Sequence, residues 1–223
     1  MARKKIEQDT ESAKERLIEA GLYLFANHGV EGVRTRILAE KAGVNQSAIP
    51  YYFGGKEGVY AAVIAKITDE LVAGFRSAGQ QENAESFSGN NAQRVCVEQL
   101  RAVIKGFTRG LLLPGRSVER TMLIVREQLQ PTESFDTLFN HFIEPLHKLI
   151  CSLIAKLQDR AADDIVVITQ AHALVGQTLA FAVARQAFLR RIDKKTIDET
   201  QIDQISEIVA SMAISAVLKL EIE

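Results

Sequence analysis

A short segment carries four side chains that can make hydrogen bonds to another molecule: Gln46, Ser47, Tyr51 and Tyr52. A glutamine amide can pair with the edge of a nucleic-acid base, and serine and tyrosine hydroxyls can bind phosphate oxygens. The same side chains could instead cover the core of a small helical subdomain. Composition alone does not separate these two interpretations, so the surrounding elements must decide between them.

Bulk charge does not favour a nucleic-acid partner. The 223-residue chain has a net charge of −1, and residues 1–57 hold nine Lys and Arg against eight Asp and Glu. A protein that binds nucleic acid through overall charge carries a clear excess of basic residues. A DNA-binding function would therefore depend on the local arrangement around residues 46–52.

The elements that position this segment are predicted to be helices. Apolar residues recur at helical spacing, the chain has only four prolines, and no segment alternates like a strand. We predict an all-α fold: an N-terminal three-helix helix-turn-helix head, residues 1–55, followed by a larger helical ligand-binding and dimerisation domain, residues 56–223. A polar connector is expected at 77–91. The later helices are expected at about 92–113, 118–130, 133–157, 164–191 and 197–222.

The second and third helices of the head are short and are joined by a tight turn. Thr35 is a predicted N-cap of the second helix, and Gly43 ends that helix by supplying a positive φ. Asn45 is the predicted cap of the third helix, which runs to Phe53. Two helices joined by a glycine-containing turn form a helix-turn-helix.

Residues 35–57 resemble the TetR family of bacterial transcriptional regulators. The likeness lies in Ala42-Gly43-Val44 at the turn, in Tyr-Tyr-Phe at 51–53, and in Lys-Glu at 56–57. The resemblance implies a third helix in the major groove of a double-stranded DNA operator, with Tyr52 and Lys56 on the DNA backbone. The DNA-contacting residues that it implies are Arg34, Thr35, Arg36, Gln46, Ser47, Ala48, Tyr51, Tyr52 and Lys56.

Pro50 departs from the family pattern, which most often has a tyrosine at this position. A proline has no backbone N–H to donate to the carbonyl of Gln46, and in an ordinary helix interior it costs roughly 3 kcal/mol. We therefore predict a recognition helix whose first turn is tightened or kinked. Which of Gln46, Ser47 and Ala48 reaches the bases stays open.

The body resembles the C-terminal domain of the CecR branch of this family, through residues 125–132, 144–147 and 172–181. The resemblance implies an unidentified small-molecule effector bound in this domain. Pro145, inside a helical pattern, should kink its helix and leave room beside it. The predicted pocket residues are Phe107, Arg126, Phe142, His147 and Phe181. The guanidinium of Arg126 would need a carboxylate, from Glu127 in a structural ion pair or from the ligand.

Two apolar stripes near the C-terminus predict a homodimer interface. They could also be intramolecular core. A symmetric dimer would hold two recognition helices about 34–36 Å apart, or a multiple of that distance, to match successive turns of the duplex. The predicted interface residues are Ile168, His172, Val175, Leu179, Val183, Ile205, Val209, Met212 and Ala216.

Other classes of function find little support. Nucleotide-binding and hydrolase signatures are absent, so we expect no catalytic residues and no cofactor. His141, Glu144 and His147 are spaced so that the two imidazoles point about 120° apart, and we expect no metal site. Two cysteines in apolar surroundings suit a reducing cytoplasm, and we expect no signal peptide and no membrane-spanning segment. A DNA-binding protein without an effector and an all-α enzyme remain as alternatives.

Overall fold

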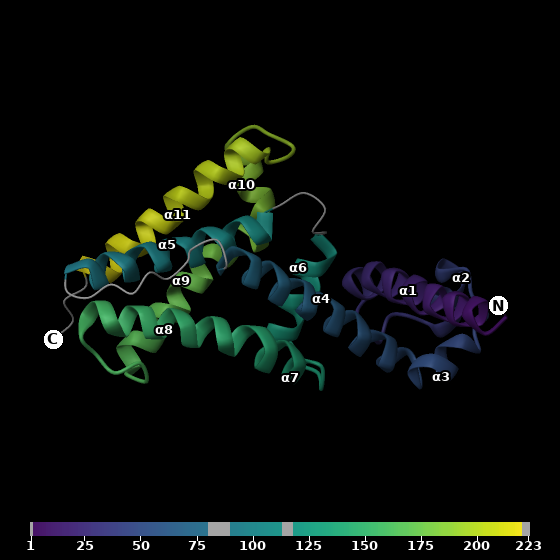
Figure 1. The fold of residues 1–223 in the computed structure, drawn as a ribbon. Coiled ribbons are helices and arrows are strands. Elements are labelled where there is room, and N and C mark those ends of the chain that lie inside the picture. The colour runs from purple at the N-terminus through teal and green to yellow at the C-terminus, as the bar shows by residue number, and fades with distance from the viewer. Residues whose placement is uncertain (1, 80–89, 113–117, 220–223) are drawn as a thin grey trace. The chain divides into compact units, whose positions relative to one another are not determined.

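The computed structural model describes the backbone of residues 2–79, 90–112 and 118–219 and the side chains of residues 11–73, 92–112 and 118–219. Within these ranges every regular element is a helix, which confirms the predicted all-α class (Figure 1). The elements are α1 (Ala2–His28), α2 (Thr35–Ala42), α3 (Ala48–Phe53), α4 (Lys56–Gly79), α5 (Asn90–Leu112), α6 (Val118–Leu129), α7 (Phe135–Leu138), the π-helical turn η1 (Phe139–Ile143), α8 (Glu144–Gln158), α9 (Ile165–Val183), α10 (Arg185–Arg191) and α11 (Glu199–Lys219).

The chain forms two compact units. Unit 1 comprises Met1–Asp69 and Ser117–Leu138, and unit 2 comprises Glu70–Arg116 and Phe139–Glu223. Unit 1 thus contains residues 56–69 of α4, together with α6 and α7, in addition to the three helices of the head. The functional division predicted after Gly55 stays a prediction.

Unit 1 is built around α1, which packs against α2, α3 and α6. Leu17 and Phe25 of α1 and Leu38 of α2 are fully buried in its core. Gly21 lets α1 and α4 approach closely, because a Cβ at this position would lie 3.1 Å from a methyl group of Val63 and 3.2 Å from one of Val59. The short helices of the head are therefore held by apolar packing onto one longer helix.

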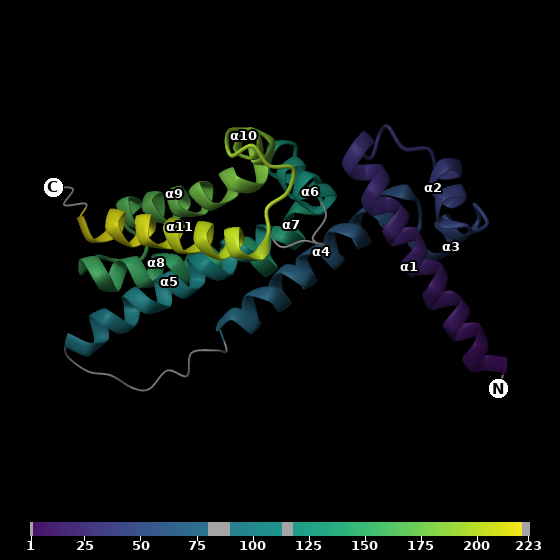
Figure 2. The same ribbon diagram turned by 90° about the horizontal axis from the view of Figure 1, so that it is seen from above.

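Unit 2 is a bundle in which α5, α8, α9 and α11 run side by side (Figure 2). Its core contains Leu100 and Ile104 of α5, both fully buried. Ion pairs join α5 to α11, where Glu207 accepts from Arg101 and, at 2.7 Å, from Lys105. Such half-exposed pairs stabilise modestly, so the bundle rests mainly on its buried apolar side chains.

Two predicted long helices are interrupted. The helix expected at 133–157 is divided into α7, η1 and α8, and Pro145 lies in the first turn of α8. A proline lacks the N–H that would continue the α-helical ladder, and the π-helical turn before it accommodates that loss. The helix expected at 164–191 ends at Ala184, which separates α9 from α10. Residues 77–79 and 90–91 of the predicted connector are helical, and 80–89 lie outside the described residues.

Helix α9 has the length and composition to cross a membrane, alone among the described helices. Its mean hydropathy is 1.5, and 22% of its most apolar stretch is buried within the chain. The expectation that no apolar run is long enough was wrong on this point, because residues 165–183 contain no charged side chain. A single such helix is weak support for a membrane segment. A helix of a soluble protein that packs one side against its own core and the other side against a partner subunit has the same composition.

Candidate nucleic-acid interface

Gly43 sets the turn between α2 and α3, as predicted. Its φ is +63°, and its N–H donates to the carbonyl of Glu40 at 3.1 Å while the N–H of Val44 donates to that of Ala39 at 3.0 Å. A Cβ at Gly43 would meet no atom within 4 Å. Glycine is therefore required by the left-handed backbone conformation and not by a lack of space.

The predicted cap at Thr35 is displaced by one residue, whereas the side chain of Asn45 caps the turn that leads into α3. Helix α2 already includes Thr35, and its N-cap is Arg34, whose side chain makes no capping hydrogen bond. Asn45 lies before the turn that leads into α3, and its Oδ1 accepts from the backbone N–H of Ser47 at 2.9 Å and from its hydroxyl at 2.8 Å. Thr35 is thus free to bond elsewhere, whereas Asn45 fixes the start of α3.

The first turn of α3 is tightened, as the presence of Pro50 predicts. The N–H of Ala48 donates to the carbonyl of Asn45 at 2.9 Å, and the N–H of Ile49 donates to that of Gln46 at 3.2 Å. These bonds span three residues, as in a 3₁₀-helix, so the carbonyl of Gln46 is satisfied without an N–H at Pro50. Proline is accommodated here because it falls in the first turn.

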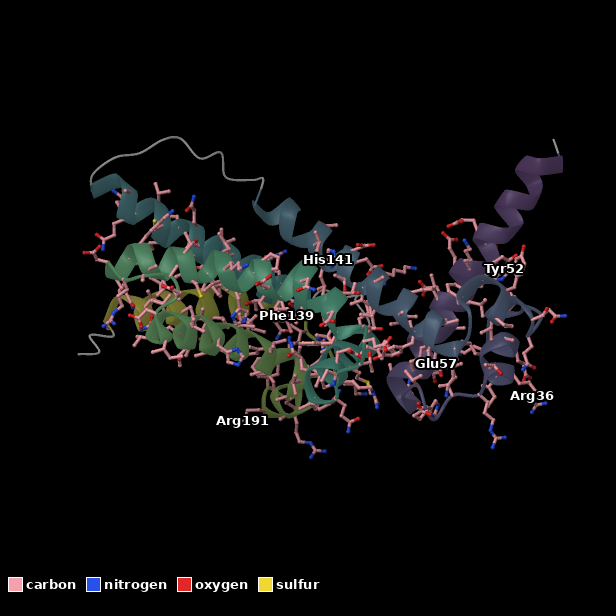
Figure 3. The ribbon with its side chains drawn as sticks, turned by 90° about the horizontal axis from the view of Figure 1, so that it is seen from below. Arg36, Tyr52, Glu57, Phe139, His141 and Arg191 are labelled. Atoms are coloured by element: carbon pink, nitrogen blue, oxygen red, sulfur yellow. The ribbon has the colours of Figure 1, made fainter. Side chains whose placement is uncertain are left out.

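Gln46, Ser47 and Tyr51 form an exposed polar surface at the start and along the outer side of α3. The side chain of Tyr51 is 80% exposed. The Nε2 of Gln46 donates to the hydroxyl of Thr35 at 3.0 Å, which brings the beginnings of α2 and α3 together. Arg34 and Arg36 of the same region are exposed, and Figure 3 shows Arg36 extending from α2. Hydrogen-bonding and cationic side chains therefore gather on one part of unit 1.

Tyr52, also labelled in Figure 3, differs from Tyr51 in being half-buried. Its ring packs edge-on against the ring of Tyr51, with centroids 4.8 Å apart, and the Nζ of Lys14 lies 5.9 Å from its centroid. Ala48 is half-buried as well. Tyr52 therefore supports the ring of Tyr51 and keeps only part of its own surface for a ligand.

Lys56 does not lie free on this surface. Its side chain is 19% exposed, and its Nζ donates to the carbonyl of Val30 at 3.0 Å and lies 3.7 Å from a carboxylate oxygen of Glu31. The ammonium group thus ties the start of α4 to the loop between α1 and α2. This placement favours a structural role over the DNA-backbone contact that the resemblance implies.

A buried carboxylate joins α4 and α6 within unit 1. The sequence alone did not predict that it accepts several hydrogen bonds. Glu127 is fully buried and accepts a 2.5 Å hydrogen bond from the hydroxyl of Tyr60. It also accepts from the backbone N–H and the hydroxyl of Thr132, each at 3.1 Å. Burial, followed by the bond to Glu127, raises the pKa of Tyr60 well above its usual range, so the phenol remains a donor.

Arg126 belongs to unit 1, whereas the other predicted pocket residues belong to unit 2. Its Nη2 donates to the carbonyl of Ala26 at 3.4 Å, and its guanidinium lies beside Gly29 at the end of α1. Glu127, its predicted ion-pair partner, takes its hydrogen bonds from Tyr60 and Thr132. The structure thus makes Arg126 a C-terminal cap of α1, and a ligand contact stays a prediction.

The other predicted pocket residues belong to unit 2. The rings of Phe107 and Phe142 lie 6.2 Å apart, and those of His147 and His172 lie 5.5 Å apart. Phe181 contacts Phe188 of α10, which was not among the predicted pocket residues. The structure therefore pairs Phe107 with Phe142, while His147 faces a residue predicted for the dimer interface. Among the described residues no three His, Cys, Asp or Glu gather in a possible metal site.

The predicted dimer residues divide between core and surface of unit 2. Val175, Ile205 and Val209 are buried within the single chain and have almost no surface left for a partner. The exposed or half-exposed members are Ile168, His172, Leu179, Val183, Met212 and Ala216. Ile208 of α11 is also exposed, although it was not among the predicted interface residues. The exposed apolar face of α11 therefore keeps Met212 and Ala216 of the predicted stripe and has Ile208 in place of Ile205 and Val209.

His147 should make stability fall as the pH drops below about 6.5. Burial, assisted by the neighbouring His172, lowers the pKa of His147 from its ordinary value of 6.5. The unfolded chain then binds a proton that the folded protein does not, so acidification favours unfolding. We expect His147→Gln to reduce the loss of stability between pH 7.5 and 5.5, measured by urea unfolding. A variant His28→Gln controls for removing a histidine, and an unchanged pH dependence in His147→Gln would contradict the prediction.

Two family models match the chain. One is described as "HTH-type transcriptional dual regulator CecR, C-terminal domain" and matches residues 96–218. The other is described as "Bacterial regulatory proteins, tetR family" and matches residues 17–63. The second match includes α2, α3 and the exposed surface of Gln46, Ser47 and Tyr51.

Individual relatives agree with these matches. The HTH-type transcriptional dual regulator CecR of Shigella flexneri is 35% identical over 205 residues, which cover 89% of this chain and 88% of the relative. The HTH-type transcriptional regulator RutR of Escherichia coli strain K12 is 36% identical over 64 residues, 29% of this chain and 30% of its own. Among solved structures, HlyIIR, a hemolysin II transcriptional regulator, shares the fold with a TM-score of 0.59 at 18% identity, over 95% of this chain and 99% of its own.

Proposed function

Because the chain belongs to the TetR family of bacterial transcriptional regulators, and to its CecR branch, we propose that it is a repressor that binds a palindromic operator as a homodimer. The observation that carries the proposal is the exposed surface of Gln46, Ser47 and Tyr51, on a helix whose direction Gly43 fixes. A chain with this role works in the cytoplasm, where the DNA is.

Each side chain of this surface has a role that follows from its chemistry. Gln46 and Ser47 can pair with base edges in the major groove, and Tyr51 can add a hydroxyl and an aromatic face. Thr35, Arg34 and Arg36 would contact phosphates. Tyr52 supports Tyr51, and Lys56 holds α4 in place. Ala48 leaves room between the longer side chains for a base edge.

The outer faces of α9 and α11 support the proposed homodimer. Val183 of α9 and Met212 and Ile208 of α11 are large apolar side chains that the single chain leaves exposed. Such a face is covered by a partner in soluble proteins, and a two-fold axis would bring the same residues of both subunits together. The palindromic operator would mirror this symmetry.

An effector bound in the C-terminal domain would release the operator by favouring one of two conformations of the dimer. The effector must bind the two conformations with different affinity, and typical coupling of about 1–3 kcal/mol changes operator affinity by roughly 5- to 150-fold. The alternative is a DNA-binding protein without an effector. A body much larger than the head favours the regulated form.

Tyr51→Ala tests the proposal, and we expect it to lower operator affinity about 30-fold. Removing one contact worth roughly 1 kcal/mol in each of two subunits costs about 2 kcal/mol per dimer. Affinity is measured by fluorescence anisotropy with a duplex selected from genomic fragments, at several salt concentrations. Tyr23→Ala removes another exposed tyrosine of unit 1 and serves as the matched control.

A wild-type protein that binds no genomic duplex even at low salt would refute the proposal. Wild-type log K should fall linearly with log salt concentration, because phosphate contacts release counterions. If Tyr51→Ala bound as tightly as Tyr23→Ala, α3 would not be the recognition helix. If it dissociated the dimer, the placement of Tyr51 would be wrong.

A further inference from the structure

Gln170, on α9 in unit 2, has a buried carboxamide that bonds to no other part of the described chain. The residue is 8% exposed, and neither its Nε2 nor its Oε1 has a hydrogen-bond partner. Exchanging the two atoms by a flip of the amide would not help, because both positions lack a partner. A buried group that can donate two hydrogen bonds and accept two is thus left unsatisfied.

The other buried polar side chains that the structure describes in unit 2 are satisfied locally. The hydroxyl of Thr108 donates to the carbonyl of Ile104 at 2.8 Å, and that of Thr178 donates to the carbonyl of Leu174 at 3.0 Å. The hydroxyl of Ser206 donates to a backbone carbonyl one turn earlier. Outside this set, the Oε1 of Gln158 is also buried without a partner, but its Nε2 donates to the carbonyl of Val217 at 2.8 Å. Gln170 alone among the described side chains of unit 2 has both amide atoms buried and unpaired. Unsatisfied buried groups of this kind are rare in native proteins because each costs free energy.

The fully buried residues on α9 and on the neighbouring α5 are uncharged and mostly apolar. Gln170 lies on the buried side of α9 with Val167 and Leu174, and α9 packs against α5, whose inward residues include Leu100 and Ile104. The described buried side chains of unit 2 include no charged residue. A charged ligand would lose its hydration here without gaining an ionic partner, whereas an uncharged ligand would lose much less.

We propose that the Gln170 carboxamide is the polar anchor of a ligand site inside unit 2. The ligand is an uncharged molecule that is apolar except for a hydrogen-bond donor and acceptor placed side by side, as in a primary carboxamide or a lactam. Such a group can accept from Nε2 and donate to Oε1 at the same time. The inference rests on the proposed function in one respect, that this ligand is the effector.

A ligand role explains why a glutamine occupies this position. A leucine of similar volume would fill the same space without a desolvated donor and acceptor, so the ligand-free protein would be more stable. Proteins retain such locally unfavourable residues where binding requires them.

Gln170→Leu should therefore raise the Tm of the ligand-free protein, by about 2 to 8 °C for a chain of this size. A lowered Tm would overturn the proposal, because it would mean that ordered water or the protein already satisfies the amide.

A matched series of six-carbon compounds tests the chemical class. Hexanamide, hexanoate and hexylammonium share one apolar chain length and differ in the charge of the polar end. We expect millimolar hexanamide to raise the Tm of the wild-type protein and the two ions to leave it unchanged. The Gln170→Leu variant should show no shift with hexanamide, whereas Gln177→Leu, a control on the same helix, should keep the wild-type response. The proposal is overturned if wild type does not respond, if hexanoate acts equally, or if Gln170→Leu responds as wild type does.

Operator binding separates this inference from the proposed function. Without hexanamide, Gln170→Leu should bind operator DNA with wild-type affinity, because the residue lies far along the sequence from the DNA-binding surface and in the other unit. Hexanamide should change the affinity of the wild-type protein only. A wild-type protein that binds hexanamide but no DNA would refute the regulator and leave the ligand site standing. A protein that binds DNA but shows no Gln170-dependent Tm shift with hexanamide would refute the ligand site and leave the proposed regulator standing.

Discussion

Met212→Glu will convert the protein to a monomer and lower its operator affinity by more than about 100-fold. Met212 is 56% exposed on α11, and the equally exposed Ile208 lies one turn before it. In the proposed dimer this apolar face is buried against a second subunit. A carboxylate placed there loses its hydration without a cationic partner, in both subunits at once.

The size of the effect follows from two contributions. A loss of about 3 kcal/mol in dimer stability raises the dissociation constant roughly 100-fold. A monomer also binds a single half-site, so the operator affinity falls further because the second half-site no longer contributes. Sedimentation equilibrium measures the mass of the particle, and anisotropy with the selected duplex measures affinity.

Leu129→Glu is the matched control for Met212→Glu. Leu129 is 77% exposed at the end of α6, outside the faces of α9 and α11. We expect this variant to stay dimeric and to bind DNA as the wild type does. If Met212→Glu remained a dimer, the interface would have to lie on another surface of unit 2. A dimer lost in both variants would point to general destabilisation.

Glu127→Ala is expected to lower the free energy of unfolding by about 3 kcal/mol. The carboxylate is fully buried, and its removal leaves the hydroxyl of Tyr60 and the backbone N–H of Thr132 without an acceptor. The buried Tyr60 hydroxyl that loses its acceptor costs about 1–3 kcal/mol, and the cavity left by the side chain adds to this cost. Urea unfolding followed by circular dichroism gives the difference.

Glu133→Ala removes an exposed glutamate from the neighbouring turn and should change stability by less than about 0.5 kcal/mol. A double-mutant cycle of Tyr60→Phe and Glu127→Gln then isolates the coupling between the two side chains. We expect a coupling energy of about 1–2 kcal/mol. If the coupling energy were near zero and Glu127→Ala were as stable as Glu133→Ala, the hydrogen bond between α4 and α6 would not contribute to the free energy of unfolding.

The head could be predicted in detail because its determinants are local. The positive φ of Gly43 and the tightened turn before Pro50 follow from bond geometry within a few residues. The exposed positions of Gln46, Ser47 and Tyr51 follow from helical spacing once the start of α3 is known. The caps were less accurate: the predicted one at Thr35 falls one residue after Arg34, since capping depends on backbone angles that residue type only favours.

The body could be predicted only in outline. Of the interface residues predicted on α11, the structure buries Ile205 and Val209 and exposes Met212 and Ala216, and it also exposes Ile208, which was not predicted. An apolar stripe shows that a helix face is covered and does not show whether the same chain or a second one covers it. Similarly, Pro145 predicted a kink in its helix, whereas the sequence did not predict that the distortion takes the form of the π-helical turn η1.

By itself, the sequence determined the helical class, the turn at Gly43 and the polar face of α3, because periodicity and backbone conformation act over a few residues. Only the tertiary structure decided that Glu127 meets Tyr60 across 67 positions, that Lys56 bonds to the carbonyl of Val30, and that Gln170 is buried without a partner. These features involve residues from separate parts of the chain, and they depend on how the apolar faces of the helices pack, which no single segment encodes.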